Sequence, residues 1–211
     1  MQDAQGVGWS RETHLSAELL ESVRGLNNRF LDLAAAQSGR SSSGEWSESI
    51  PVGLSAAVSA QIAPLSAAQK AAAANCPYAL FDLRFRDDGH WRTRFGDAGR
   101  WSVADSAPVH ADRLDFVRLA LFFAWHVASA GKVAAQLLLG MHEGTVAAFR
   151  TASIDCLPAL AATEAVHLTA RWNDCPAYWG ALADAAARPN AAGLRKIQLY
   201  GLQLAAAARL T

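Results

Sequence analysis

The sequence predicts a mainly α-helical fold: a helical bundle with a helix-turn-helix-like hairpin, plus a small β-hairpin around residues 80–95. Three observations lead to this prediction. Hydrophobic residues make up 52% of the 211-residue chain and charged residues 18%, which is enough apolar surface to form a core. Alanine is abundant while Val, Ile, Thr and Tyr are scarce, which favours helix over strand. Apolar residues also recur at helical spacing over long stretches.

An N-terminal helix is predicted between residues 11 and 37, where an apolar stripe recurs every three or four residues. The stripe consists of Leu15, Leu19, Leu20, Val23, Leu26, Phe30 and Leu33. Residues 38–51 are rich in serine and glycine without a period, which is typical of a flexible connection. We therefore divide the chain into residues 1–52 (helix and Ser-rich linker), residues 53–114 and residues 115–211.

The middle segment is expected to hold a helix followed by a β-hairpin. An alanine-rich stretch contains the helix-capping residue Ser66 and ends at Asn75-Cys76-Pro77. Apolar and charged residues then alternate across residues 81–86, and the alternation resumes across residues 91–95 after a glycine-containing turn. A hairpin alone is marginal in water, so it should pack on the helices or pair with a second copy of the chain.

The last segment should be entirely helical. A long helix begins at His110 and runs to about Ser129; it is apolar on most sides, as in a buried helix or a dimer core. Lys132 to Leu139 should form a short helix that ends at Gly140, because glycine readily takes a positive φ angle. Further helices are expected from within residues 142–145, from Ser153 to Arg171, and from Ala192 to Leu210.

The two short helices joined through Leu139-Gly140-Met141 have the spacing of a helix-turn-helix. Ala134 and Ala135 would let the helices approach, and Val146 would pack between them. An ordinary helical hairpin explains the glycine equally well, because many such hairpins place glycine at the turn. The turn alone therefore leaves both interpretations open.

The second half of the chain contains, in this order, Leu121-Phe122-Phe123-Ala124, Gly131-Lys132, Leu139-Gly140-Met141-His142-Glu143, Leu160-Ala161-Ala162-Thr163, Ala170-Arg171-Trp172 and Leu194-Arg195-Lys196-Ile197. These segments resemble successive landmarks of the bacterial flagellar transcriptional regulator FlhD family, over about residues 115–210. The chain departs from the family where Leu168 replaces a cysteine that some members use for an inter-subunit disulfide. It also departs where Gly131 replaces an acidic residue.

The resemblance implies an all-α homodimeric subunit of a transcription activator, which binds promoter DNA together with an FlhC-like partner subunit, here for motility or secretion genes. Lys132, His142 and Arg150 are the candidate DNA-binding residues, since they lie in or beside the predicted helix-turn-helix. The alternative is a non-DNA-binding adaptor or anti-regulator that sequesters a protein partner. A formal net charge of zero favours this alternative.

Two further groups of residues are candidate binding surfaces. The second-choice nucleic-acid patch combines Arg84, Arg86, Arg92 and Arg94 with Trp91. Aspartates interleave with these arginines, so ion pairs across a solvated hairpin are the preferred explanation. The other group, a candidate partner interface, consists of Trp125, Trp172 and Trp179, although tryptophans are most simply explained as core anchors.

The usual templates for catalysis and metal binding fail. His142-Glu143 is followed by Val146 where a zinc protease motif needs histidine, and His110, His126 and His167 stand alone in the sequence. The three cysteines are widely spaced. We therefore expect no enzyme, no cofactor and no metal site. Since neither a secretory signal nor a membrane-spanning stretch is visible, we expect a cytoplasmic protein that does not enter a membrane.

Overall fold

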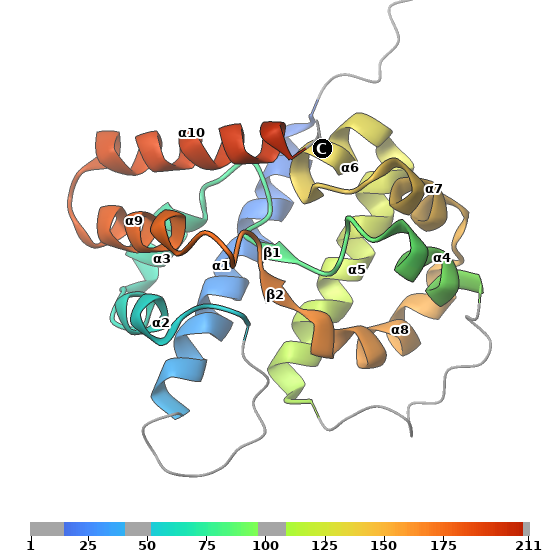
Figure 1. Ribbon diagram of the computed structural model, residues 1–211, viewed down its shortest axis with the longest axis horizontal. Helices are drawn as coiled ribbons and strands as arrows, with labels where there is room; N and C mark the ends of the chain where they lie inside the picture. The colour runs from blue at the N-terminus through green and yellow to red at the C-terminus, as the bar shows by residue number, and fades with distance from the viewer. Residues whose placement is uncertain (1–14, 41–51, 97–108, 209–211) are drawn as a thin grey trace, which may run out of the picture.

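The computed structural model describes residues 15–40, 52–96 and 109–208, so most of the expected linker lies outside the described residues (Figure 1). Two short strands, β1 (Phe81–Asp82) and β2 (Thr169–Ala170), form an antiparallel sheet. The mainly α-helical prediction with a small β element is confirmed. The α-helices are α1 (Ala17–Arg40), α2 (Ala56–Ile62), α3 (Ala67–Ala74), α4 (Asp88–Gly96), α5 (Ala111–Ala130), α6 (Lys132–Leu139), α7 (Glu143–Thr151), α8 (Leu157–Glu164), α9 (Pro176–Ala187) and α10 (Ala191–Ala207).

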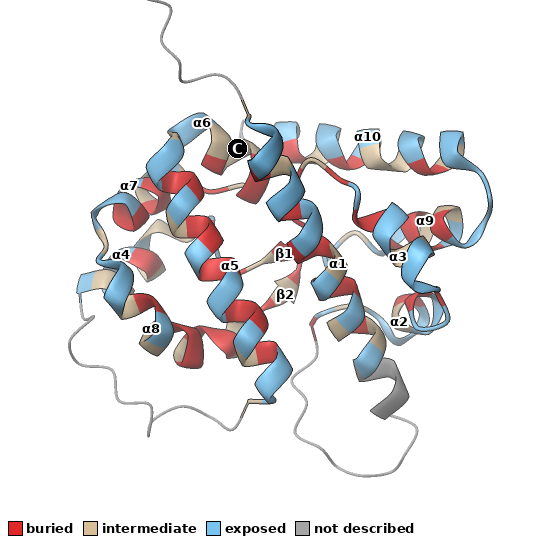
Figure 2. Cartoon of the chain, turned by 180° about the vertical axis from the view of Figure 1, so that it is seen from behind, coloured by how far each residue is buried: buried red, intermediate tan, exposed pale blue. Residues whose placement is uncertain are grey.

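Helices α1 and α5 pack against each other in the middle of the molecule (Figure 2). On one side, α2, α3 and α9 pack together and α10 lies on α9; on the other, α6, α7 and α8 pack on α5. The 3-10 turns η3 (Ile154–Cys156) and η4 (Ala165–His167) flank α8. Helix α4 packs on α7. One face of α5, the long apolar helix of the sequence, is therefore buried within this chain by several neighbours, whereas its residues Leu119 (41%) and Phe122 (36%) are exposed.

Aromatic rings join all three segments of the chain into one core. The Phe30 ring of α1 lies 6.2 Å from Phe81 of β1 and 6.0 Å from Phe116 of α5, measured between ring centroids. The ring centroid of Trp179 in α9 lies 6.2 Å from that of Phe30. The apolar stripe predicted for the N-terminal helix faces this core, with Val23 and Phe30 fully buried.

The asparagine Asn27 fastens α1 to the segment between α3 and β1. Its side chain is fully buried. The Nδ2 atom donates to the carbonyls of Ala74 (3.2 Å) and Tyr78 (2.8 Å), and Oδ1 accepts from the Leu80 backbone N–H (2.8 Å). All three partners are backbone groups. This one side chain therefore provides hydrogen bonds to a segment that lies outside the regular helices and strands.

The predicted cap at Ser66 is confirmed. Its hydroxyl accepts from the Gln69 backbone N–H (3.3 Å), and the Gln69 side chain accepts from the Ser66 N–H (2.8 Å), which forms a capping box for α3. The expected helix from Ser153 is shorter than predicted: after the 3-10 turn η3, α8 ends at Glu164 and the chain then enters β2. The residues from 165 to 171 therefore form a turn and a strand instead of helix.

The predicted hairpin needs a correction. The first strand exists as β1, but its partner is β2, with Phe81 opposite Ala170. Residues 91–95 belong to helix α4. Trp91 and Phe95 are four residues apart, a spacing that fits one face of a helix as well as one face of a strand, and both rings pack on Phe149 of α7. The Asp87 carboxylate accepts from the His90 N–H (2.9 Å) and so starts the helix.

Within the described parts of the chain, none of the helices has both the length and the apolar character needed to cross a membrane.

Candidate functional site

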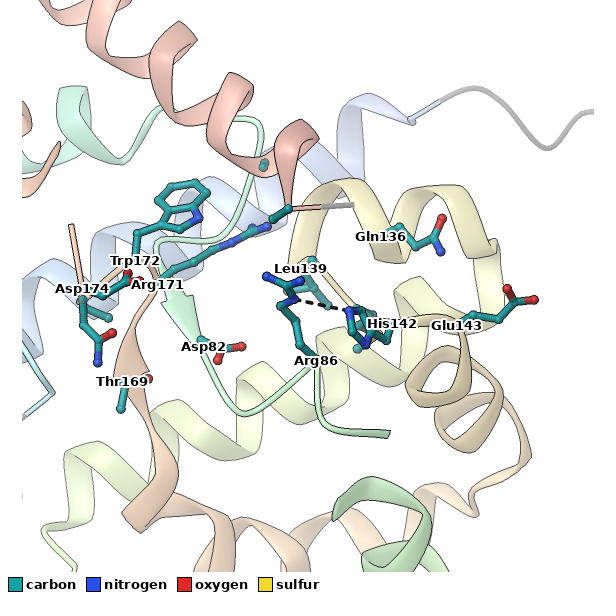
Figure 3. Close-up of a pocket in the computed structure, with 16 residues that line it drawn as sticks. Asp82, Arg86, Gln136, Leu139, His142, Glu143, Thr169, Arg171, Trp172 and Asp174 are labelled. Atoms are coloured by element: carbon teal, nitrogen blue, oxygen red, sulfur yellow. Dashed lines mark hydrogen bonds between the residues drawn. The ribbon is translucent and has the colours of Figure 1, made fainter. Parts of the chain in front are cut away.

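A pocket of about 520 Å³, which we call the turn pocket, lies beside the turn between α6 and α7 (Figure 3). This volume is within the range of small-molecule sites. Its walls come from four parts of the chain: the β1 region, the end of α6 with the turn, β2 with the turn after it, and the end of α10. The residues that matter for its chemistry are Asp82, Arg86, Gln136, Leu139, Gly140, His142, Glu143, Arg171, Trp172 and Asp174.

Gly140 forms the turn in the left-handed conformation, with φ 72° and ψ 23°. Its N–H donates to the carbonyls of Ala135 and Gln136, which closes the C-terminal end of α6. A Cβ atom at this position would lie 2.5 Å from Nη2 of Arg171. Backbone conformation and lack of space therefore both require glycine here.

Arg171 is buried behind the turn and links three elements. Its Nη1 lies 3.3 Å from the Leu138 carbonyl at the end of α6 and 3.5 Å from the Ala79 carbonyl. Its guanidinium carbon lies 4.7 Å from the centre of the Trp172 ring, as in a cation–π contact. Burial lowers the pKa of Arg171 to about 10, so the side chain still carries a positive charge at neutral pH.

Asp82 supplies a carboxyl group to the same pocket. Burial is the largest influence on this group and raises its pKa, against the lowering effect of the Phe85 backbone N–H, which donates to Oδ1 (3.2 Å). The nearby Arg171 charge also lowers the pKa. The turn pocket is therefore lined by two arginines, Arg86 and Arg171, and by three acidic residues, Asp82, Glu143 and Asp174.

Arg86 and His142 meet at the side of the pocket that faces the turn, where their side chains point toward each other (Figure 3). Arg86 Nε donates to His142 Nε2 over 3.4 Å, so this nitrogen of the imidazole acts as an acceptor. The His142 backbone N–H donates to the Phe85 carbonyl (3.1 Å). His142, predicted to contact DNA, is therefore connected to the segment after β1.

The other two predicted DNA-binding residues lie apart from this contact. Lys132 Nζ forms an ion pair with Glu143 Oε1 at 2.7 Å, which bridges the starts of α6 and α7. Arg150 is exposed in the last turn of α7. Thus Lys132 and His142 each contact a charged side chain of this chain, whereas Arg150 stands on the open face of α7.

The N-terminus of α7 is covered by Asp88, the first residue of α4. Asp88 Oδ1 accepts from the Thr145 backbone N–H (2.8 Å) and from its hydroxyl (2.9 Å). A Cβ atom at position 144 would lie 2.6 Å from Asp88 Oδ2, so Gly144 leaves room for the carboxylate. Asp88 therefore acts as a cap supplied by another helix, and it places negative charge at the positive end of the helix dipole.

The second-choice basic patch is divided among several contacts. Arg84 pairs with Asp87 (2.6 Å), Arg94 pairs with Glu164 (2.8 Å), and Arg92 Nε donates to the Asp88 carbonyl (3.3 Å). Trp91 is fully buried, and its Nε1 donates to the Arg84 carbonyl. A nucleic-acid base would have no access to this ring. The preferred explanation by ion pairs is supported, but the pairs lie in and around α4 and not across a hairpin.

The three candidate interface tryptophans all pack within the chain. Trp179 is 1% exposed and donates from Nε1 to the Arg171 carbonyl (2.8 Å). Trp125 is half-buried and donates to the Ala152 carbonyl (3.1 Å). Trp172 has a φ angle of 55° and packs edge-on against Tyr78 and Tyr178. These contacts make the tryptophans anchors of this fold.

Sequence reasoning missed Asp82, Arg86 and Asp88 as neighbours of the turn, because they come from more than 50 positions away in the chain. The one available signal was Gly144, a glycine in the first turn of a predicted helix. Glycine at such a position indicates close approach of another group. In comparisons with known proteins, no family model, no curated protein and no solved structure matches this chain.

Proposed function

We propose that this chain is a regulatory subunit with an FlhD-like helical scaffold, which acts by binding a protein partner and does not bind DNA on its own. The observation that carries the proposal is the covered N-terminus of α7. In a helix-turn-helix, the N-terminal residues of the second helix contact the base edges. Here the corresponding end of α7 is bound by the Asp88 carboxylate.

Charge around α7 supports the same proposal. DNA binding draws most of its affinity from cations placed near phosphates. The described residues at the start of α7 include two carboxylates, Asp88 and Glu143, which offset the positive charges of Lys132, paired with Glu143, and of Arg86, which donates to His142. Arg150 is the exposed cation on this helix. A phosphate approaching the start of α7 would therefore meet no excess of positive charge.

A groove along α10, which we call the α10 groove, is the surface best suited to a partner. It has a volume of about 980 Å³ and is lined mainly by apolar atoms from α10 and from Ala72 and Asn75 at the end of α3. The exposed apolar residues Leu199 (56%) and Tyr200 (43%) line it. Such exposure of large apolar side chains side by side is typical of a protein-binding surface.

The charge of the α10 groove indicates the chemistry of its partner. Between Ala191 and Ala207 the charged residues are Arg195 and Lys196, both basic and both lining the groove. An amphipathic helix with an apolar stripe and acidic flanks would match this combination. We therefore propose an acidic amphipathic helix of a regulatory protein as the occupant.

A crosslinking experiment tests the partner proposal at the level of single positions. A photo-crosslinking amino acid is placed at Leu199, and as a control at exposed Ala147 on α7, in cells that naturally produce the chain. We expect one protein with an acidic amphipathic helix to be captured from position 199 alone, and the capture to fall when Arg195→Glu and Lys196→Glu are added. Capture that is equal at both positions, or unaffected by the charge reversal, contradicts the proposal.

DNA binding by the purified chain is tested separately. Fluorescence anisotropy with labelled duplex DNA at low salt should show no binding, because low salt maximises the electrostatic contribution. Binding that weakens with Arg150→Ala, but not with Arg188→Ala, would contradict the proposal. Arg188 is a suitable control because it is exposed and pairs only locally, with Asp184 four residues earlier (3.0 Å).

A second candidate function is DNA contact within a complex, as the FlhD resemblance implies. The left-handed turn at Gly140 and the burial of Val146 in α7 favour it, since both are features of a helix-turn-helix. The same anisotropy measurement with the captured partner added distinguishes the two functions. Under this second function, Arg150→Ala lowers promoter affinity and its salt dependence; under the adaptor function, the complex does not bind the promoter.

A further inference from the structure

Three metal-ligating side chains from distant parts of the chain meet beside α4. His90 comes from α4, Glu164 is the last residue of α8, and His167 ends the 3-10 turn η4. One ligand atom from each of these residues lies within 4.8 Å of the other two. In sequence terms His167 stands alone, but the structure places its ring centroid 5.4 Å from that of His90.

Glu164 is the centre of this group and is fully buried. Its Oε2 lies 2.7 Å from His90 Nε2, and its Oε1 lies 2.8 Å from Arg94 Nε. His90 and Arg94 are one helical turn apart on α4, so both reach the same carboxylate. Arg94 therefore holds one oxygen of Glu164 and orients the other toward the two histidines.

Glu164 and His167 are three residues apart, and this spacing matters for metal binding. A Glu-x-x-His pair on a helical turn projects both side chains to the same side, an arrangement used by helical metalloproteins. The turn η4 keeps the backbone helical between the two residues. The pair thus supplies two ligands from one short segment, and His90 adds the third from another helix.

We propose that His90, Glu164 and His167 bind a divalent transition-metal ion of the zinc class. Two imidazoles and one carboxylate are a known ligand set for Zn²⁺ and for other first-row metals, whereas Mg²⁺ and Ca²⁺ prefer ligands that are all oxygen. Ligand atoms around a tetrahedral zinc lie about 3.3 Å apart. In the present structure the ligand atoms lie within 4.8 Å of one another, so metal binding requires the three side chains to move closer together.

The state without metal is a hydrogen-bonded ion cluster, and metal binding changes it in a defined way. The metal takes the place of the hydrogen between His90 Nε2 and Glu164 Oε2, while Arg94 stays on Oε1 as an outer partner that orients the carboxylate. Burial lowers the pKa of His167, against the raising effect of the Glu164 carboxylate, and so favours the neutral imidazole that binds metals. The positive charges of Arg84 and Arg94, which also lower this pKa, weaken the attraction for a cation and predict moderate affinity.

A metal bound at this site would join α4 to the end of α8. Helix α4 carries Asp88, which covers the N-terminus of α7. A metal that joins His90 to Glu164 and His167 therefore stabilises α4 in the position in which Asp88 caps α7. This effect concerns stability of the chain and does not depend on the function proposed above.

The test uses the full chain without an affinity tag, freed of metal by a chelator and titrated with Co²⁺ and then Zn²⁺. We expect one equivalent of Co²⁺ to bind with the visible absorption of a low-coordinate site, Zn²⁺ to displace it, and Zn²⁺ to raise the melting temperature. His167→Ala should weaken binding by more than about tenfold. The matched control, His126→Ala, removes an exposed histidine of α5 and should leave binding unchanged.

A second measurement uses the unaltered chain, so its result does not depend on whether the variants fold. Zinc should shift the imidazole nitrogen resonances of His90 and His167 and leave those of the other histidines in place. Absence of stoichiometric binding, equal affinity in His167→Ala and the unaltered chain, or shifts at other histidines would each overturn the proposal and assign the cluster to an ion pair alone.

Discussion

The guanidinium of Arg171 lies against Gly140, so that an added Cβ atom would meet Nη2 at 2.5 Å and Cζ at 3.0 Å. This relationship joins the turn after α6 to the turn after β2. The arginine also donates to the Leu138 carbonyl near the end of α6 and so takes the role that a C-terminal cation has for a helix dipole. The geometry of the helix-turn-helix pair therefore depends on a residue about 30 positions further along the chain.

Gly140→Ala should destabilise the chain by about 2–4 kcal/mol, because alanine at a φ of 72° is strained and its methyl group overlaps Arg171. Urea unfolding followed by circular dichroism measures the change. Gly25→Ala is the control: this glycine lies within α1 with no atom near its Cβ position, so alanine should stabilise by about 0.5–1 kcal/mol. Equal effects of the two substitutions would show that the contact at position 140 is unimportant.

Arg171→Lys tests the same contact from the other side. Lysine keeps the charge but lacks the planar guanidinium, whose Nη1 donates to both the Leu138 and Ala79 carbonyls while the group lies over the Trp172 ring, so we expect a loss of about 2–3 kcal/mol. In this background Gly140→Ala should be less harmful by about 1 kcal/mol, measured as the coupling energy of a double-mutant cycle. Arg188→Lys, at an exposed ion pair, serves as the control with a change near zero. A coupling energy of zero would refute the direct contact.

Asp88→Ala should lower stability by about 1–2 kcal/mol, because it leaves the Thr145 N–H and hydroxyl without their acceptor. Asp88→Asn keeps an oxygen acceptor, so it should lose less than half of that amount. Denaturant unfolding of the two variants gives the comparison, with Asp115→Ala in an exposed ion pair on α5 as the control. If the asparagine and alanine variants were equally unstable, the cap would depend on charge and not on hydrogen bonding.

Helices could be predicted from the sequence wherever one apolar stripe decides the structure. Val23 and Phe30 mark the buried face of α1, Ser66 starts α3, and Gly140 ends α6. In each case the cause lies within a few residues of its effect. Local propensity, capping and periodicity are properties of short segments, so a single sequence contains them.

Strand pairing and the candidate site could not be predicted in this way. Phe81 pairs with Ala170, and Trp91 belongs to a helix although its spacing fits either structure. Helix is favoured at Trp91 because its ring packs against Phe149 of α7, which contacts one face of α4. Arg171 over Gly140 and His90 beside His167 likewise depend on how distant segments pack. A spacing that fits both helix and strand, and contacts between residues about 30 to 90 positions apart, cannot be resolved from a local sequence pattern.

Asn27→Ala should be among the most damaging polar substitutions, with a loss of about 3–5 kcal/mol. It removes three buried hydrogen bonds and leaves the Leu80 N–H and the Tyr78 carbonyl without their partner, whereas the Ala74 carbonyl still accepts from the Cys76 N–H (2.7 Å). The next residue is a matched control, because Asn28 Oδ1 is buried without a hydrogen-bond partner among the described residues. Asn28→Ala should therefore change stability by less than about 1 kcal/mol. Thermal unfolding of both variants decides, and a larger loss at position 28 would reverse our account of how α1 is attached.

Alkaline pH should unfold the chain through three buried acids beneath α10. Burial raises the pKa of Cys76 from 9.0 to about 11 and also raises the pKa values of Tyr78 and Tyr178, whose hydroxyls lie 3.1 Å apart. These groups stay protonated in the folded chain and lose protons on unfolding. Their contribution to stability is therefore complete below pH 9 and falls as pH rises above it.

The loss of stability from Cys76 alone should be about 2 kcal/mol at pH 11 and level off at about 3 kcal/mol above it, since each pKa unit is worth about 1.4 kcal/mol. Urea unfolding at a series of pH values from 7 upward should show the midpoint falling above pH 9, and tyrosinate absorbance should rise together with unfolding. Cys76→Ala should make the fall begin nearer pH 10, where tyrosine ordinarily ionises. Tyrosinate absorbance from all tyrosines in a chain that remains folded would contradict the burial of the Tyr78 and Tyr178 hydroxyls.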